Sequence, residues 1–149
     1  MVDAPATVNG MLISGMAGGD RTARGFIEGY DPETGKRLWR TWTIPEPGQK
    51  GSETWPNKDM PDAWKYGGGA TWQSGSYDPQ LDLFYIGTGN PEPYNPKYRA
   101  GMDSLSAVNL LAIRPKTGRT VGCSQVTTTD TFEFHATGDR SLAGVPTAG

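Results

Sequence analysis

Hydrophobic and polar residues alternate along much of the chain in short runs, and the runs are separated by glycine, proline, asparagine and aspartate. Alternation over four to eight residues places apolar side chains on one face of an extended segment, as in a β-strand. In residues 37–44, Arg40 and Trp42 share one face, whereas Trp39 and Thr41 share the other. The pattern predicts strands over residues 8–14, 25–30, 37–44, 81–88 and 107–113, and no segment gives a strong helical signal.

The segments between these strands are tight turns and long loops. Pro32 presets φ at the second position of the turn at residues 31–35, and Gly35 accepts a positive φ at its end. Residues 45–66 contain four prolines and no usable periodicity, and a second loop rich in Gly, Asn and Pro covers residues 89–101. Loops of this length are often functional.

One hairpin unit occurs twice. Residues 29–36 (GYDPETGK) line up with residues 112–119 (AIRPKTGR), so a strand, a turn and a returning strand are repeated. The second copy has Gly122 where the first has Trp39. Repeated hairpins are typical of propeller blades or of another stacked all-β array, and we therefore expect an all-β fold.

The composition fits short strands joined by turns. The chain has 21 Gly and 12 Pro, and only 35% of its residues are hydrophobic, which approaches the composition of disordered segments. Five Trp, six Tyr and four Phe argue against disorder, because unfolded tails contain few aromatic residues.

Charge and cysteine content exclude several function classes. A net charge of −2, from 14 basic and 16 acidic residues, argues against nucleic-acid binding. The single Cys123 excludes an internal disulfide framework and a thiolate-clustered metal site. No apolar run is long enough for a membrane span, and the first residues show no secretory signal. Either the protein is cytosolic or its true beginning is missing, and the motifs below favour the second alternative.

The repeated unit Gly29-x-Asp31-x-x-Thr34-Gly35-x-x-x-Trp39 resembles the tryptophan-docking motif of the quinoprotein alcohol dehydrogenases. Further motifs of that family follow in its order and at about its spacing: Gly18-Gly19-Asp20 before Arg24-Gly25-Phe26, Gly67-Gly68-Gly69-Ala70-Thr71-Trp72, Tyr77-Asp78-Pro79 and Gly87-Thr88-Gly89-Asn90-Pro91. The resemblance covers roughly residues 4–137. It implies about two blades of an eight-bladed β-propeller that is several times longer than this chain. Residues 1–137 are expected to form this partial propeller, and residues 138–149 an unassigned, disordered tail.

The resemblance also implies pyrroloquinoline quinone (PQQ) as cofactor and a bound metal ion, usually calcium. Calcium takes six to eight oxygen ligands, which carboxylates and amide carbonyls supply. Asp20 and Asn90 match the family's metal-ligand positions, although Asp20 is one methylene shorter than the family's Glu. The alternative is that both are ordinary turn residues, because Asp and Asn favour turns.

Trp72 matches the tryptophan that lies beneath PQQ in the family. An indole is the largest flat apolar surface among the side chains, which suits a planar tricyclic quinone. Gly18, Gly19 and Ala70 match positions that line the cofactor, mostly through their backbone. The alternative for Trp72 is packing in the core.

The match is weaker at the family's catalytic base, the last residue of a Thr-Pro-His-Asp-x-Trp-Asp segment. Residues 127–133 (TTTDTFE) align with it, so Glu133 corresponds to the base and Asp130 to the earlier Asp. A Glu can accept the same proton, but its extra methylene displaces the carboxylate. His135 stands where the lanthanide-using members have a further Asp, which favours calcium over a lanthanide.

In the family these parts oxidise a primary alcohol to an aldehyde in the periplasm and pass electrons to a cytochrome c. Two alternatives remain open: a propeller fragment that binds cofactor or metal without catalysis, and a structural repeat module. The chain alone is expected to be inactive. An arginine and other cofactor contacts come from the family's remaining propeller blades, and its adjacent-cysteine disulfide is absent.

Overall fold

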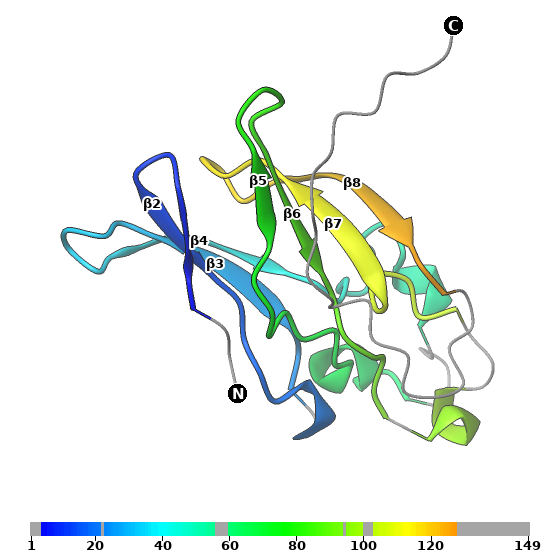
Figure 1. The fold of residues 1–149 in the computed structure, drawn as a ribbon. Helices are drawn as coiled ribbons and strands as arrows, with labels where there is room; N and C mark the ends of the chain where they lie inside the picture. The colour runs from blue at the N-terminus through cyan, green and yellow to red at the C-terminus, as the bar shows by residue number, and fades with distance from the viewer. Residues whose placement is uncertain (1–3, 22, 56–59, 94, 100–102, 128–149) are drawn as a thin grey trace, which may run out of the picture.

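The structure, a computed structural model, describes residues 4–21, 23–55, 60–93, 95–99 and 103–127. Within these residues the chain forms two four-stranded antiparallel sheets, each with its strands in sequence order (Figure 1). The first sheet contains β1 (Ala6–Val8), β2 (Met11–Ser14), β3 (Phe26–Tyr30) and β4 (Arg37–Trp42). The second contains β5 (Ser76–Asp78), β6 (Leu83–Gly87), β7 (Asn109–Ile113) and β8 (Thr120–Gln125). The all-β expectation is confirmed.

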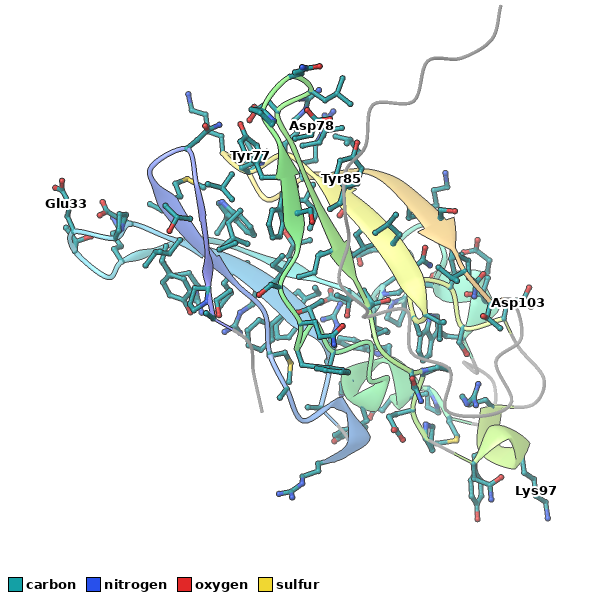
Figure 2. The ribbon with its side chains drawn as sticks, viewed as in Figure 1. Glu33, Tyr77, Asp78, Tyr85, Lys97 and Asp103 are labelled. Carbon is teal, nitrogen blue, oxygen red and sulfur yellow. The ribbon has the colours of Figure 1, made fainter. Side chains whose placement is uncertain are left out.

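Short 3-10 helices are the only helices in the described part of the chain. They are η1 (Gly19–Arg21), η2 (Ser52–Thr54), η3 (Ala63–Tyr66) and η4 (Pro96–Arg99). None of these described helices has the length and apolar character needed to cross a membrane. The helices gather at one end of the sheets, and the hairpin turns lie toward the other (Figure 1). Side chains mark the two ends: Glu33 and Asp78 lie near hairpin turns, and Lys97 projects from η4 (Figure 2).

The predicted single strand over residues 8–14 is wrong, because the segment folds as the β1–β2 hairpin. Asn9 and Gly10 form its two-residue turn with φ of 47° and 74°. Positive φ at both positions gives the twist that joins antiparallel strands, and Asn-Gly is the dipeptide that adopts it most readily. Strand β5 is absent from the predicted strands, because it has only three residues.

The repeated hairpin is confirmed in both sheets. The β3–β4 pair shifts register at Gly29/Tyr30, and the β7–β8 pair shifts at the equivalent Ala112/Ile113. The two turns also end alike, because Gly35 and its counterpart Gly118 have φ of 68° and 71°.

The two sheets pack face to face around one apolar core. Its buried side chains come from both sheets: Val8, Ile13 and Ile27 from the first, and Phe84, Ile86, Leu111 and Ile113 from the second. Burial of these aliphatic and aromatic side chains is the main force that holds the sheets together.

Trp39 completes this contact at the outer strands. Its ring lies over Gly29 of its own sheet, where a Cβ atom would come within 2.4 Å of Cε2. On the other side, a Cβ on Gly118 would come within 2.4 Å of Cε3 of the same ring. The Thr41 hydroxyl donates a hydrogen bond of 2.6 Å to the Gly118 carbonyl. Trp39 therefore docks the first sheet onto the turn of the second.

A smaller core organises the long loop at residues 45–66. Ile44, Trp55 and Ala107 are buried together, with Trp64 packed against them. The Trp55 indole N–H donates a hydrogen bond of 3.0 Å to the Leu105 carbonyl. The loop at residues 45–66 and the segment before β7 therefore support each other.

Candidate cofactor and metal site

The glycine run at residues 67–69 lies between two other loops and is hydrogen-bonded to both. The amide of Gly25 donates to the Gly68 carbonyl at 2.7 Å, and the Gly68 amide donates to the Ala23 carbonyl at 3.1 Å. On the other side, the Gly69 amide donates to the Asn90 backbone carbonyl at 2.8 Å. A Cβ atom on Gly68 would come within 2.4 Å of that carbonyl oxygen. Only glycine permits this approach, together with a φ of 72° at Gly68.

Ala70 is the point at which the three loops meet. A Cβ atom on Gly19 would come within 2.9 Å of the Ala70 Cβ atom. The Gly89 amide donates to the Ala70 carbonyl at 2.8 Å. A Cβ atom on Gly89 would also lie 3.7 Å from the Trp72 indole nitrogen. The loops that carry the predicted cofactor-lining residues are therefore in direct contact.

The two predicted metal ligands directly follow Gly19 and Gly89. Asn90 is buried, with 8% of its surface exposed, and its side-chain oxygen Oδ1 has no hydrogen-bond partner. An unpaired buried carbonyl costs about 1–3 kcal/mol, and a hard cation would satisfy it. The backbone of Asp20 lies in η1, and its side chain is outside the part of the structure that can be described.

A calcium ion takes six to eight oxygen ligands, so oxygen atoms besides Asn90 Oδ1 would complete such a site. The described residues contain no cluster of three or more His, Cys, Asp or Glu side chains that could hold an ion. Asn90 Oδ1 is an amide oxygen. Amide oxygens are ligands of hard cations such as calcium.

Trp72 is half buried where the loops meet. The described cavity that it helps to line, with Ile13, Thr71 and Phe84 among the other residues, has a volume of only about 10 Å³. That space is too small for a tricyclic quinone. A cofactor stacked on Trp72 would therefore have to lie against the exposed part of the indole.

The predicted site residues divide into three groups. The structure brings together the loops of Gly18, Gly19, Ala70, Trp72 and Asn90. It places the backbone of Asp20 next to them without a described side chain. Glu133 and Asp130, the predicted base and its neighbour, lie outside the described residues, so their roles stay predictions.

Buried threonines that sequence reasoning missed support these loops. The Thr43 hydroxyl donates to the Gly69 carbonyl at 2.8 Å. The Thr88 hydroxyl donates to the Ser106 carbonyl at 2.9 Å and accepts from the Asn109 amide at 2.9 Å. These bonds fix the backbone on either side of the site. The sequence offers a signal for Thr88 alone, which lies within the motif at residues 87–91, and that position does not identify its partners.

Arg24 holds the long loop against the site. Its Nε donates to the Ile44 carbonyl at 3.0 Å, and its Nη1 pairs with Glu46 at 2.8 Å. The guanidinium carbon lies 4.6 Å from the ring centre of Trp42 and 4.7 Å from that of Trp64. Burial lowers the pKa of Arg24, and the hydrogen bond and charge of Glu46 oppose this shift.

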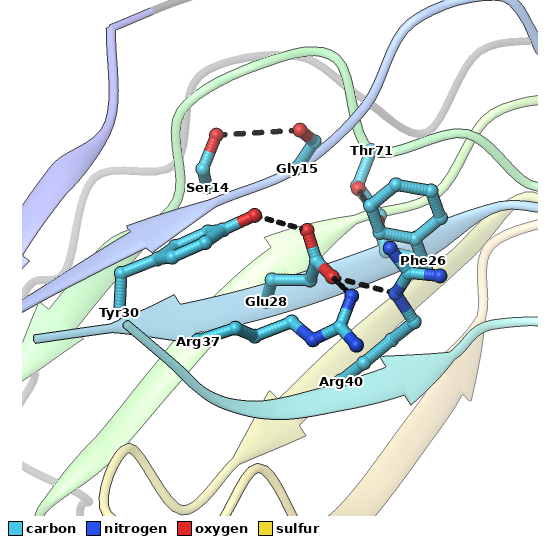
Figure 3. Close-up of polar contacts among 8 residues, drawn as sticks. All are labelled: Ser14, Gly15, Phe26, Glu28, Tyr30, Arg37, Arg40 and Thr71. Carbon is cyan, nitrogen blue, oxygen red and sulfur yellow. Dashed lines mark hydrogen bonds and ion pairs between the residues drawn. The ribbon is translucent and has the colours of Figure 1, made fainter. Parts of the chain in front are cut away.

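A second charged cluster lies on β3 and β4 (Figure 3). The buried Glu28 accepts hydrogen bonds from the Tyr30 hydroxyl, from Arg37 at 2.9 Å and from Arg40 at 2.6 Å. Burial raises the pKa of Glu28, but the hydrogen bonds from Tyr30, Arg40 and Arg37 outweigh it and hold the pKa below its ordinary value. Both carboxylate oxygens of Glu28 accept hydrogen bonds from side chains of β3 and β4, so this cluster stabilises the first sheet.

Comparison with known proteins connects these loops to a family. The family model described as "Glucose/ethanol/alcohol dehydrogenase, beta-propeller domain", under the name PQQ, matches residues 1–149. The chain is 41% identical over 152 residues to the quinohemoprotein alcohol dehydrogenase ADH IIB of Pseudomonas putida, over 94% of this chain and 22% of that protein. It is 33% identical over 164 residues to the lanthanide-dependent methanol dehydrogenase of Methylacidiphilum fumariolicum, over 98% of this chain and 26% of that protein.

A solved structure gives the same result. The quinohemoprotein alcohol dehydrogenase of Comamonas testosteroni superposes with a TM-score of 0.84 at 32% identity, over 91% of this chain and 22% of that one. The chain thus spans 22–26% of the length of these relatives. Its two four-stranded sheets correspond to about two blades of their propeller. The chain therefore belongs to the PQQ-dependent alcohol dehydrogenase family.

Proposed function

We propose that this chain supplies two blades and part of the PQQ and metal site of an alcohol dehydrogenase that oxidises a primary alcohol to an aldehyde. The contact of three loops at Ala70 carries the proposal, because it collects residues from both sheets around one point. The unpaired Oδ1 of Asn90 beside that contact supports a metal ion there.

The residues take distinct roles in this proposal. Trp72 provides the flat surface beneath PQQ, and the backbones of Gly18, Gly19 and Ala70 border it. Asn90 and Asp20 hold a calcium ion through their side-chain oxygens. PQQ supplies the hydride acceptor when it is bound. The protein supplies placement and a fixed electrostatic environment.

Glu133, with Asp130 near it, accepts the hydroxyl proton of the alcohol. A carboxylate within hydrogen-bond reach of the substrate is sufficient for this step. The remaining blades supply the other cofactor contacts. The electron acceptor is a cytochrome c, and the location is periplasmic.

Binding without turnover is the second candidate. It is favoured by one observation: residues 127–133 depart from the family's base segment at several positions, including the base itself. Misplacement of a carboxylate by about one ångström can cost about a hundredfold in rate. Such a protein would bind PQQ and metal and turn over slowly.

A graft separates these candidates. Residues 4–137 replace the matched segment of Pseudomonas putida ADH IIB, whose remaining blades complete the propeller. We expect the purified graft to retain PQQ and one calcium ion, and to reduce an electron-accepting dye with ethanol. Bound PQQ and metal without dye reduction would select the binding-only candidate. A well-folded graft that cannot bind PQQ would refute the cofactor proposal.

The metal role of Asn90 has a matched control. Asn90→Ala should weaken calcium binding at least about tenfold, since outer partners of metal ligands alone are worth about 10- to 100-fold. Asn95→Ala removes an exposed asparagine whose side chain accepts from the Lys97 amide at 3.0 Å, and it should leave calcium affinity unchanged. Equal calcium affinities in the two variants would remove Asn90 from the site. Parallel titrations with lanthanum test the preference for calcium.

A further inference from the structure

Thr71 lies in the segment between the two sheets, directly before the predicted cofactor surface. It is fully buried, at 0% exposure, and precedes Trp72 in sequence. Its hydroxyl donates a hydrogen bond of 2.6 Å to the carbonyl of Phe26, at the start of β3. Figure 3 shows Thr71 beside Phe26.

The same hydroxyl also receives a hydrogen bond. The backbone amide of Met16 donates to Thr71 Oγ1 at 3.3 Å. Met16 belongs to the loop that continues to Gly18 and Gly19. The hydroxyl oxygen of Thr71 is therefore hydrogen-bonded both to β3 and to this loop. A hydroxyl can both donate and accept, so Thr71 uses it in both directions.

Gly15 shows how closely this loop approaches Thr71. A Cβ atom on Gly15 would lie 1.8 Å from the Thr71 carbonyl oxygen and 2.4 Å from its Oγ1. No other residue type fits at position 15 without displacing Thr71 or the loop. The loop thus contacts Thr71 at two points: Gly15 packs against the Thr71 backbone carbonyl, and the Met16 amide donates to the Thr71 hydroxyl.

From this geometry we propose that Thr71 is a positioning residue, which sets the location of Trp72 relative to the loop bearing Gly18 and Gly19. The importance of that location for PQQ rests on the function proposed above. The hydroxyl acts through Trp72 and the loop and does not have to touch the cofactor.

The test uses the full chain labelled with 5-fluorotryptophan. Its fluorine spectrum has one resonance for each of the five tryptophans, and Trp72→Phe assigns the one that matters. Thr71→Val keeps the shape of the side chain and removes the hydroxyl, whereas Thr71→Ser keeps the hydroxyl. Thr54→Val is the matched control, because the Thr54 hydroxyl also donates to a carbonyl, that of Gly51 at 2.7 Å, and accepts from a backbone amide, that of Leu105 at 2.9 Å.

We expect Thr71→Val to shift or broaden the Trp72 resonance and to speed hydrogen exchange at the Met16 amide. Thr71→Ser should restore both signals, and Thr54→Val should leave both unchanged. Where PQQ and calcium bind, Thr71→Val should weaken PQQ binding about tenfold, as the loss of one hydrogen bond implies.

Three results would overturn the positioning role: an unmoved Trp72 resonance in Thr71→Val, no recovery in Thr71→Ser, or an equal shift in Thr54→Val. If Thr71→Val does not fold, the milder Thr71→Ser and the Gly15→Ala variant decide. Gly15→Ala keeps the hydroxyl but forces the loop away, so it should shift the Trp72 resonance. An absence of PQQ binding in the well-folded ADH IIB graft counts against the proposed function alone, because the fluorine and exchange signals need no cofactor.

Discussion

Two glycines in equivalent turns should respond very differently to the same substitution. Gly35 and Gly118 end the repeated turns with φ of 68° and 71°. At Gly35 a Cβ atom would meet nothing within 4 Å, whereas at Gly118 it would lie 2.4 Å from the Trp39 ring and 2.8 Å from Thr41 Oγ1. Alanine in the left-handed region costs about 1–2 kcal/mol at either position. Only Gly118→Ala also displaces the docking tryptophan.

The contacts around each glycine determine how much the two substitutions differ in their effect on the free energy of unfolding. Forcing an extra methyl group into a packed contact typically costs about 1–3 kcal/mol. We therefore expect Gly35→Ala to lower the free energy of unfolding by about 1–2 kcal/mol. Gly118→Ala should lower it by about 2–5 kcal/mol, the sum of the two costs.

Urea unfolding, followed by circular dichroism, measures both variants under the same conditions. A double-mutant cycle with Trp39→Ala then isolates the contact, because removal of the ring leaves room for the new methyl group. The excess cost of Gly118→Ala should disappear in the Trp39→Ala background. Equal destabilisation by the two glycine variants, or an excess that persists without the ring, would refute the docking of Trp39 on Gly118.

Two further predictions concern the charged clusters. Because the folded pKa of Glu28 is lowered from 4.5, its stabilisation is present above that value and is lost as the pH falls through the folded pKa. Glu28→Gln should therefore reduce the loss of unfolding free energy that occurs as the pH is lowered, whereas the exposed Glu33→Gln should leave that loss unchanged. An equal dependence of unfolding free energy on pH in the two variants would contradict this. Arg24→Lys should lower the unfolding free energy by about 1–3 kcal/mol, since lysine cannot reproduce the fork to Ile44 or the ring stacking. The exposed Arg114→Lys should change the free energy by less than about 1 kcal/mol in the same urea titration.

The sequence predicts the repeated hairpins well because their turns depend on local chemistry. Pro32 and Gly35 impose backbone angles that no distant contact has to supply. The apolar run across Asn9-Gly10 predicts one strand, although the dipeptide is an equally local signal for the turn of the β1–β2 hairpin. Strand β5 is only three residues long, too short for alternation to identify.

The site could be predicted in part, and the reason lies in the range of the interactions. The glycine-rich motifs and their family resemblance identify the loops around Ala70. The partners of Thr71 and Thr43 could not be found this way, because their hydroxyls bond carbonyls 45 and 26 residues away. A buried hydroxyl and an exposed one have the same letter in the sequence, and only the packing of the sheets distinguishes them.

The sheets are joined by two separate links, and the candidate site depends on both. Trp39 on Gly118 joins the outer strands, whereas the backbone contacts of Ala70 with Gly19 and Gly89 join the loops. A change in the tilt between the sheets at Trp39 would move the loops as well, because Trp39 packs against the core that both sheets share and a close-packed interior transmits strain. Gly118→Ala should therefore also perturb the fluorine resonance of Trp72, whereas Gly35→Ala should not. If Trp72 is insensitive to Gly118→Ala, the loops hold the site without help from the docking tryptophan.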